Sequence, residues 1–407
     1  MGSAPERKNE SPMARIPELD GIRVLLVFIV SWYHIWQQSW LHPHIGDISL
    51  DFLVRAGYFL VDGTVFLSAF LLFMPYARAM RGEGTVPDRR LFYQQRVQRT
   101  LPSYYFLILL TFFGVALPYG LYSSGPFLVK DLFTHLTLTF PFSYETYYAT
   151  PLGGAYWTLA IEWQAYLLFP FLARWIMKRP WGMVPLAALA FLWRGYAIWA
   201  YTEYPMVVNQ LPAFLDVYAL GMASALVFLW LQERVAALTR GWKWTVETGM
   251  TLAVAGLLVL YVLLITVQSK SPDTVAIQRG QMERRPLQAL LMAGLTLALP
   301  FSLKPVRLLF GNRVMTFLSS LSMNYYMIHQ SLAVHLKRIG FPPSISPNPN
   351  MDLEQPWQTQ YTLAAFGLSL ILAILVTYLI EKPAGRLLKR WMDRRHGSSP
   401  DPGLSER

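Results

Sequence analysis

Apolar residues gather in runs of about twenty along most of this chain, and short polar segments separate the runs. A bilayer core of about 30 Å needs about 20 apolar residues per helix, so each run predicts a membrane-spanning helix. The ten predicted spans are 22–41, 51–76, 100–120, 156–176, 181–202, 211–231, 247–267, 286–303, 314–336 and 361–380. The pattern therefore predicts an all-α, polytopic membrane protein.

Basic residues are divided unequally between the segments that join these spans. If the N-terminus is cytoplasmic, every inner segment is basic, namely 77–99, 174–179, 234–243, 304–313 and the tail after Glu381. The outer segments 42–50, 121–155 and 203–210 together hold one Lys and no Arg. Only 268–285, with four basic residues, departs from the positive-inside pattern. We therefore predict that both termini are cytoplasmic.

The spans leave no room for a soluble domain. We expect a disordered N-terminal segment at 1–15, a single transmembrane domain at 16–390, and a disordered tail at 391–407 that is rich in polar residues, Gly and Pro. The outer segment 121–155 is rich in Tyr, Gly, Ser and Pro, and it is a candidate lid.

Composition supports the membrane assignment and removes several kinds of function. The 407 residues are 54% hydrophobic and 14% charged, whereas about a quarter of the residues in soluble proteins are charged. The net charge of +11 comes from residues between long apolar runs, so we expect a lipid bilayer and no nucleic acid as partner. Because the chain has no cysteine, disulfides, thiolate metal sites and an acyl-cysteine intermediate are excluded. We expect no bound metal.

Six ionisable side chains fall inside predicted spans, where a charge costs about 3 kcal/mol. They are His34, Asp62, Glu162, Arg194, Asp216 and His329. Residues of this kind usually face a protein-lined or wet cavity, so we expect the helices to enclose a polar tunnel. Arg194 and Asp216 allow a second interpretation, which is a pair that holds two adjacent helices together.

Arg23 and His34 lie on one face of the first span. They are eleven positions apart, which returns to within about 20° of the same face and rises about 16 Å along a helix. This spacing suggests a channel that holds a phosphate at its cytoplasmic mouth and performs chemistry further inside. An interfacial arginine and a hydrogen-bonded core histidine would also fit the pattern.

The segment DRRLFYQQRVQRTLP adds further cationic side chains. Arg89, Arg96 and Arg99 fall at i, i+7 and i+10, which is one helical stripe. Arginine forks bind phosphate oxygens in a bidentate manner. The alternative is an amphipathic segment that lies on anionic lipid.

Two later spans carry polar side chains as well. Glu162 lies about two turns inside the outer interface, which Tyr156 and Trp157 mark, and His34 approaches the same level from the other side. Glu162 is therefore expected to orient the His34 ring or to contact an acceptor hydroxyl. The stretch SLSMNYYMIHQSL adds polar residues that cannot all face lipid, which are Asn324, Tyr325, Tyr326 and His329.

At these positions the sequence resembles the membrane acyltransferase-3 family, and the resemblance extends over about 16–390. The opening family pattern, Leu-Asp-Gly-x-Arg followed by an apolar run and a His, is met by LDGIR and His34. The second-span pattern is close to VDGTVFLSAFL, which includes Asp62 and Ser68, with the spacing shifted by one residue and Ala69 where Gly is usual.

Four further motifs follow in the family's order. Arg96 and Arg99 match its Arg-x-x-Arg pattern. Its Trp-Ser-Leu-x-x-Glu pattern is similar to WTLAIE, although Trp163 replaces the usual second acidic residue. The late Ser-x-x-x-Tyr-x-x-His pattern resembles SMNYYMIH, and EKP resembles the closing Glu-x-Pro segment. Six motifs in the right order on ten predicted spans make the resemblance specific.

The resemblance implies transfer of an acyl group, most often acetyl, from cytoplasmic acyl-coenzyme A to a hydroxyl on the outer side of a bacterial cytoplasmic membrane. Acceptors in the family are mostly bacterial surface glycans, and some are antibiotics such as macrolides. Some relatives carry a fused extracytoplasmic hydrolase-like domain. This chain ends soon after its tenth predicted span, so we expect it to act alone or with a separate extracytoplasmic transferase.

We expect Arg23, Arg96 and Arg99 to hold the phosphates of the coenzyme. His34 is the expected general base, because the reference pKa of imidazole, about 6.5, suits proton acceptance from a hydroxyl at neutral pH. Glu162 would orient His34 or the acceptor. The expected supporting residues are Asp20, Asp62, Ser68, Trp157, Asn324, Tyr326 and His329.

The details of the chemistry leave alternatives open. Asn324, Tyr326 or His329 would donate a hydrogen bond to the developing oxyanion. Direct transfer is the favoured route, but a relay through an acyl-histidine, or through an acylated Ser68 or Ser322, is not decided by the sequence. The sequence also does not decide the acceptor, the length of the acyl group or the oligomeric state. A transporter or flippase of an anionic glycolipid or polysaccharide precursor is the main alternative function.

Overall fold

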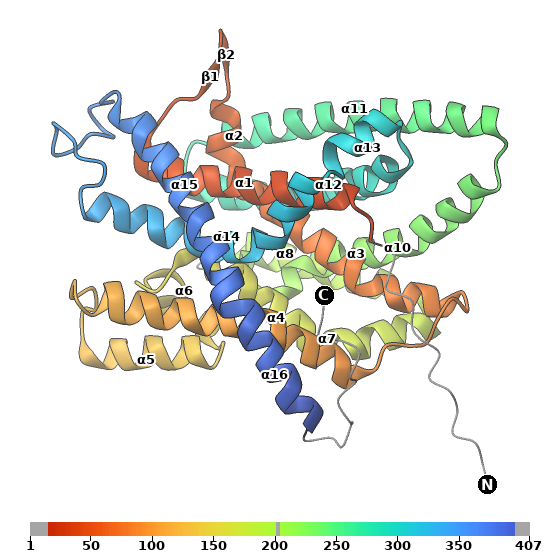
Figure 1. Cartoon of the computed structure of the whole chain (residues 1–407), viewed down its shortest axis with the longest axis horizontal. Coiled ribbons are helices and arrows are strands. Elements are labelled where there is room, and N and C mark those ends of the chain that lie inside the picture. The colour runs from red at the N-terminus through yellow and green to blue at the C-terminus, as the bar shows by residue number, and fades with distance from the viewer. Residues whose placement is uncertain (1–14, 201–203, 395–407) are drawn as a thin grey trace.

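The computed structural model describes residues 15–200 and 204–394, which are helical almost throughout. The long helices are α1 (Glu18–Ser39), α3 (Val61–Met80), α4 (Arg89–Thr111), α7 (Trp157–Lys178), α8 (Met183–Ala200), α10 (Leu215–Ala236), α11 (Arg240–Ser269), α12 (Thr274–Ala298), α14 (Arg313–Arg338) and α15 (Trp357–Val376). The shorter helices are α2 (Asp51–Ala56), α5 (Gly125–Leu136), α6 (Tyr144–Tyr148), α9 (Tyr204–Val208), α13 (Lys304–Phe310) and α16 (Lys382–Arg394). Figure 1 shows their arrangement.

Short turns complete the chain between these helices. The 3₁₀ turns are η1 (Gly57–Leu60), η3 (Phe140–Phe142), η4 (Gly154–Tyr156), η5 (Pro180–Gly182), η6 (Leu211–Phe214) and η7 (Leu299–Phe301). The π-helical turns are η2 (Phe112–Ala116) and η8 (Thr377–Glu381). Within the described residues, the two strands β1 (His44–Ile45) and β2 (Ile48–Ser49) form one antiparallel hairpin. Most of the predicted end segments, 1–15 and 391–407, lies outside the described residues.

Each of the ten predicted spans falls on a long helix, but several helices begin away from the predicted starts, and α4 and α12 begin earliest relative to them. Helix α4 begins at Arg89, eleven positions early, because the Asp88 carboxylate accepts a hydrogen bond from the Leu91 amide at 2.9 Å. Helix α12 begins at Thr274, because Asp273 accepts from the Ala276 amide at 2.8 Å. Such N-caps satisfy amides in the first turn and extend a helix beyond its apolar run.

The apolar helices identify a polytopic membrane protein. In the described residues, seven helical segments are long and apolar enough to cross a membrane. They are Glu18–Ser39, Asp51–Met80, Arg89–Ala116, Pro180–Ala200, Leu211–Ala236, Arg240–Ser269 and Trp357–Met392. The pair Thr274–Phe301 and Lys304–Arg338, bent by 119°, passes the same test when taken together. Ten spans and two cytoplasmic termini stay predictions.

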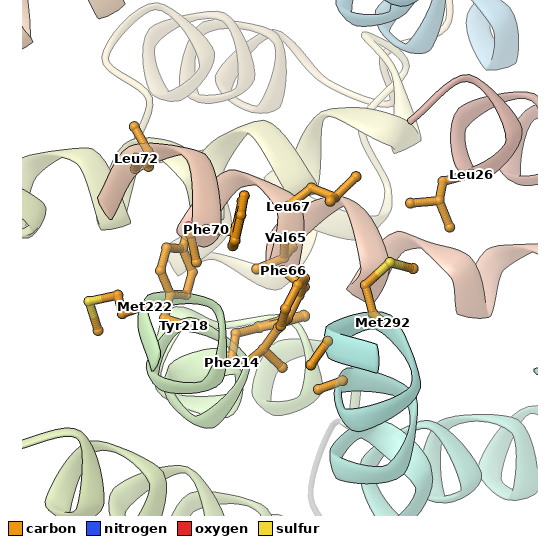
Figure 2. Close-up of a cluster of buried hydrophobic side chains, with 14 of the residues drawn as sticks. Leu26, Val65, Phe66, Leu67, Phe70, Leu72, Phe214, Tyr218, Met222 and Met292 are labelled. Carbon is orange, nitrogen blue, oxygen red and sulfur yellow. The ribbon is translucent and has the colours of Figure 1, made fainter. Parts of the chain in front are cut away.

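The largest core lies where α3 crosses α10 and α12. Figure 2 shows Phe66 and Phe70 of α3 packed among side chains of α10 and α12, including Met292. A Cβ atom on Gly221 of α10 would lie 2.7 Å from the Ala69 Cβ atom, so the two helices touch through their smallest residues. Close packing through small residues is a common way to join helices in a membrane.

Helix α1 lies against α14, α15 and α3, which places its polar face inside the bundle. A Cβ atom on Gly21 would lie 2.5 Å from the Phe310 carbonyl oxygen, so only glycine permits this approach to α13. Phe28 stacks on Tyr325 of α14 with ring centroids 4.6 Å apart. The start and the middle of α1 are therefore fixed by separate contacts.

Helix α15 continues through the π-helical turn η8 into α16, and Figure 1 shows them as one long rod across the near face. The π turn ends at Glu381, whose carboxylate accepts a hydrogen bond from Asn324 at 2.6 Å. Single π turns are often found at functional sites. Helix α16 packs against α4 and extends to Arg394, so the helical part of the chain passes the predicted domain boundary at 390.

Candidate active site

Three arginines from two helices gather around one carboxylate. The charged neighbours of Glu162 on α7 are Arg23 of α1 and Arg96 and Arg99 of α4. Arg23 also lies near Asp20. In the part of the chain that the structure describes, no direct ion pair joins Glu162 to these arginines, and Arg23 and Arg99 make no hydrogen bonds through their side chains. Their guanidinium donors are thus available to an anion.

Arg89 does not share this position. Its guanidinium lies over the ring of Phe171, 5.0 Å from the centroid, and its side chain is exposed. Arg96 instead lies over the rings of Phe92 and Tyr166, at 5.3 and 5.5 Å. The predicted three-arginine stripe therefore divides, because α4 turns only Arg96 and Arg99 toward α1 and α7.

Glu162 lies with the arginines rather than beside His34. Its carboxylate accepts a hydrogen bond from the Tyr166 hydroxyl at 3.0 Å, one helical turn further along α7. His34 hydrogen-bonds with Gln37 instead. A direct carboxylate–imidazole pair between Glu162 and His34 is absent from the described contacts. The reason is that α7 presents Glu162 toward the start of α1, about three turns from His34.

The partner of His34 is a second histidine. His34 of α1 and His329 of α14 have ring centroids 5.2 Å apart. His34 Nδ1 lies 3.2 Å from Gln37 Oε1, and the Gln37 amide donates to the Tyr33 hydroxyl at 2.9 Å. His329 Nδ1 lies 2.7 Å from the Tyr326 carbonyl oxygen. Both rings are therefore oriented by hydrogen bonds within their own helices.

These hydrogen bonds also assign the ring protons. Because an amide oxygen and a backbone carbonyl can only accept, the Nδ1 atoms of His34 and His329 must donate. In the neutral rings each Nε2 atom then carries a lone pair. His329 is fully buried and its Nε2 atom has no partner within the described residues, whereas His34 is half-buried. The structure thus presents two imidazole bases side by side.

The three expected oxyanion donors differ in whether they have a hydrogen atom that is free to form a hydrogen bond. Asn324 gives its amide hydrogens to Thr377 at 2.7 Å and to Glu381 at 2.6 Å, so it cannot serve as this donor in the structure. Neutral His329 offers a lone pair at Nε2 and not a hydrogen. Tyr326, whose buried hydroxyl lies near Thr158, is the donor that remains.

A line of polar side chains joins the arginines to the histidines. Tyr326 has Glu162 as a charged neighbour, and its ring lies 5.4 Å from that of His329, which in turn meets His34. This line crosses α7 and α14. Along α1 itself, the stripe between Arg23 and His34 is filled by buried Val27, Val30 and Ser31.

Residues 153–154, in the loop before α7, pack against α14 close to His329. Gly153 has φ of +146°, and a Cβ atom there would meet a Tyr156 ring carbon at 2.6 Å and Ser331 Oγ at 2.8 Å. Only glycine adopts this conformation readily. The loop before α7 therefore lies against α14 two residues beyond His329.

Other predicted site residues have structural partners. The Asp20 carboxylate accepts hydrogen bonds from Ser319 at 2.9 Å and Thr316 at 3.2 Å, which tie α1 to α14. Ser322 donates to the Ser319 carbonyl oxygen at 2.8 Å. Trp157 is partly buried and packs at the border of two hydrophobic cores. Ser68 lies on α3, half-buried, and no described contact joins it to the histidines.

Asp62 belongs to a separate network of buried charges. Its carboxylate accepts a hydrogen bond from Arg285 at 2.8 Å, and both side chains are almost completely buried. Arg194 and Asp216 form a two-bonded pair at 2.7 and 2.8 Å, which supports the second of their two interpretations, a pair that joins adjacent helices. Asp62 therefore stabilises the contact of α3 with α12 and lies apart from the histidine pair.

Sequence reasoning assigned Arg285 to an outer connection, and this was wrong. The side chain is fully buried within α12, where it also donates to the carbonyl oxygens of Val208 and Ala213. Arg284 donates to Gln268 at 2.7 Å, and Arg279 pairs with Glu283 at 2.8 Å. In the segment 268–285, which departs from the positive-inside pattern, the arginines thus form hydrogen bonds or ion pairs with other side chains of the protein. The N-cap at Asp273 was the signal that could have found it.

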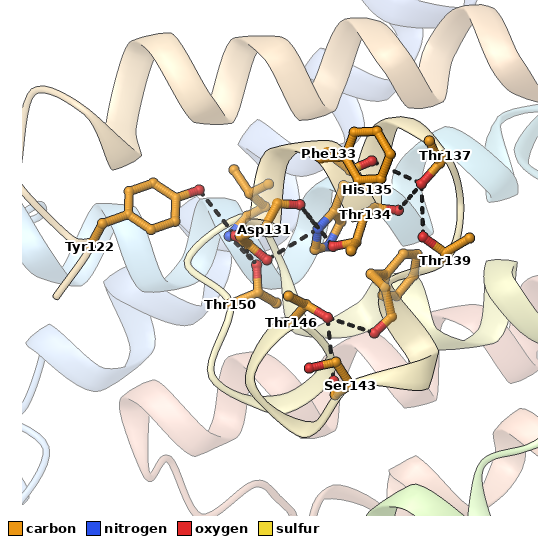
Figure 3. Close-up of polar contacts among 12 residues, drawn as sticks. Tyr122, Asp131, Phe133, Thr134, His135, Thr137, Thr139, Ser143, Thr146 and Thr150 are labelled. Atoms are coloured by element: carbon orange, nitrogen blue, oxygen red, sulfur yellow. Dashed lines mark hydrogen bonds and ion pairs between the residues drawn. The ribbon is translucent and has the colours of Figure 1, made fainter. Parts of the chain in front are cut away.

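A buried polar cluster in the segment 121–155 was also missed. Figure 3 shows Asp131 of α5 accepting hydrogen bonds from Tyr122 at 3.0 Å and Thr150 at 2.9 Å. His135 lies 3.2 Å from the same carboxylate, and both side chains are fully buried. Burial and the neighbouring Asp131 carboxylate raise the pKa of the Tyr122 phenol, which therefore stays protonated and donates. The i, i+4 spacing of Asp131 and His135 was the available signal.

The described residues contain no group of three or more His, Asp or Glu side chains suited to holding a metal ion. Among curated proteins and among solved structures, comparison finds no match to this chain. A family model described as an acyltransferase domain matches residues 16–382. With that match covering most of its length, this polytopic membrane protein is an acyltransferase that belongs to the acyltransferase-3 family.

Proposed function

We propose that this protein transfers an acyl group, with acetyl as the expected group, from cytoplasmic acyl-coenzyme A to a hydroxyl of an extracytoplasmic carbohydrate or glycosylated metabolite in a bacterial cytoplasmic membrane. The observation that carries the proposal is the polar line from three arginines to two histidines. Arginines with free donors suit the coenzyme's diphosphate, and imidazole bases suit the reaction at its thioester.

In this proposal the coenzyme phosphates bind Arg23, Arg96 and Arg99. The pantetheine arm follows the polar line past Glu162 toward Tyr326 and not the apolar stripe of α1. Burying the thioester away from water limits its hydrolysis before an acceptor arrives. Glu162 would offset part of the mutual repulsion of the arginines while no coenzyme is bound, and it would orient Tyr166.

His34 acts as the general base at the end of this line. Its Nε2 atom accepts the proton of the acceptor hydroxyl while that oxygen attacks the thioester carbonyl carbon. The Tyr326 hydroxyl donates to the resulting oxyanion. As the carbon–sulfur bond breaks, the coenzyme thiolate leaves and takes the proton from His34, which returns the ring to its starting form.

Purified protein in lipid nanodiscs, given acetyl-coenzyme A with a labelled acetyl group and a panel of glycans and glycosylated metabolites, tests the proposal. We expect the label to move to an acceptor hydroxyl as free coenzyme A is released, and His34→Ala to stop both. Movement of a glycolipid across the bilayer with the thioester left intact would instead favour a transporter.

A further inference from the structure

A solvent-accessible cavity lies between α4 and α16, and Arg99 is the residue that it shares with the site described so far. Its volume is about 590 Å³, which is within the range of ligand-binding pockets. The lining residues are Gln95, Gln98, Arg99, Tyr378, Glu381, Lys382, Gly385, Arg386 and Lys389. Four of them are cationic and one is acidic, so the cavity favours an anion.

The cationic side comes from one stripe of α16. Lys382, Arg386 and Lys389 fall at i, i+4 and i+7, which is one helical face, and all three are exposed. A Cβ atom on Gly385 would lie 3.1 Å from the Gln98 carbonyl oxygen, so this glycine brings the stripe close to α4. The stripe therefore faces a neighbouring helix across the cavity.

The acidic residue of the cavity is already engaged. Glu381 accepts the hydrogen bond from Asn324 and has Arg99 and Lys382 as charged neighbours. The Lys382 ammonium lies 3.8 Å from the centre of the Tyr378 ring. Arg386 and Lys389 have no described ion pair, so they are the cations most available to a ligand.

Arg99 links this cavity to the interior. It lines the cavity, and it is also a charged neighbour of Arg23 and Glu162. A second cavity of about 600 Å³ lies on the other side of α4 and is lined by Arg89 and Arg90. Neither Arg99 nor its interior neighbours line this second cavity. A long anion with two phosphate-bearing parts could therefore contact the interior arginines and the α16 stripe together.

We propose that Arg386 and Lys389 bind the 3′-phosphate of the donor's adenosine, while the diphosphate lies at Arg99 and the interior arginines. The inference rests on the proposed use of acyl-coenzyme A. It follows from the order of groups in that molecule, where the 3′-phosphate lies beyond the diphosphate as seen from the thioester. A lipid phosphate would reach the α16 stripe but would have no reason to share Arg99 with the interior.

The experiment compares acetyl-coenzyme A with acetyl-dephospho-coenzyme A, which lacks only the 3′-phosphate. The full-length protein is placed in nanodiscs of neutral lipid, and KM and kcat are measured for both donors. We expect the wild-type protein to show a KM about tenfold lower for the phosphorylated donor, in keeping with a charged hydrogen bond. Arg386→Ala and Lys389→Ala should each reduce this preference severalfold, with kcat little changed.

Arg390→Ala is the matched control, because Arg390 is an exposed cation on the same helix that lines neither cavity. It should keep the wild-type preference. Equal KM values for the two donors in an active wild-type protein would overturn the inference and leave the proposed function standing. If the Arg386 and Lys389 substitutions change KM only in nanodiscs of anionic lipid, the two residues bind lipid and the inferred 3′-phosphate site is overturned.

Calorimetric binding of coenzyme A and dephospho-coenzyme A separates the two proposals when neither donor supports transfer. Tighter binding of coenzyme A that depends on Arg386 and Lys389 would support the phosphate site although the proposed reaction had failed. Equal binding of the two compounds would remove the phosphate site.

Discussion

His34 and His329 lie with their ring centroids 5.2 Å apart, and each ring donates a hydrogen bond from Nδ1 to its own helix. The consequence is that both Nε2 atoms are left as acceptors in the neutral rings. Half-buried His34 and fully buried His329 are thus adjacent bases at the end of the row of polar side chains that begins at the arginines.

The His34 ring depends on Gln37 for its tautomer. Gln37→Leu removes the acceptor at Nδ1, so kcat should fall about tenfold with the donor KM unchanged, the kinetic equivalent of about 1.4 kcal/mol. Gln37→Glu keeps an oxygen acceptor and should retain more of the activity. Steady-state kinetics on both variants gives the answer, and a rise in KM alone would assign Gln37 to donor binding.

His329 is expected to act with His34 as one unit. His329→Ala should lower kcat while coenzyme binding, measured by calorimetry, survives. Residues that act together give non-additive losses, so His34→Ala combined with His329→Ala should be little worse than His34→Ala alone. Independent, multiplying losses in the double variant would contradict a shared role.

Removing the charge of Glu162 should strengthen the anion site. Glu162→Gln keeps the size of the side chain and an acceptor for Tyr166, but it leaves the three arginines without their negative neighbour. We expect the affinity for coenzyme A to rise about fivefold or more at low salt, since two unit charges about 4 Å apart interact by about 1 kcal/mol in bulk water and by more near a protein surface. Weaker binding in this variant would mean that Glu162 positions the arginines rather than opposing the ligand.

The Asp62–Arg285 pair should matter for stability more than for chemistry. Asp62→Ala leaves a buried guanidinium unpaired and should destabilise the fold by about 3–5 kcal/mol. Replacing both residues, with Asp62→Leu and Arg285→Met, removes both charges and should recover part of that loss. Thermal unfolding in detergent compares the variants, and a double variant less stable than Asp62→Ala would argue against this account.

Asp131 should hold the segment 121–155 together. Asp131→Ala leaves the half-buried hydroxyls of Tyr122 and Thr150 without their common acceptor, at about 1–3 kcal/mol for each unsatisfied group, and it removes the carboxylate that lies 3.2 Å from the His135 ring. Hydrogen exchange and limited proteolysis should therefore show faster opening of this segment while the membrane helices stay protected. Lys130→Ala, which removes only an exposed ion pair with Glu145, is the control and should leave exchange nearly unchanged.

The amino-acid sequence alone determined the all-helical membrane fold and the family, because a bilayer imposes a length and an apolar composition that can be read without contacts. It also singled out Arg23, His34 and His329, since ionisable residues in apolar runs are costly and stand out. It placed the helix starts at 100 and 286 too late, because caps such as Asp88 and Asp273 act beyond the apolar pattern.

Only the tertiary structure decided which of these residues meet. It brought Glu162 to the arginines and His329 to His34, and it placed Asp62 with Arg285. Helical periodicity fixes the face on which a side chain lies, but not the neighbouring helix that this face contacts or the rotation of that helix. Those depend on close approaches between residues far apart in the chain, such as Gly21 against Phe310 and Gly221 against Ala69.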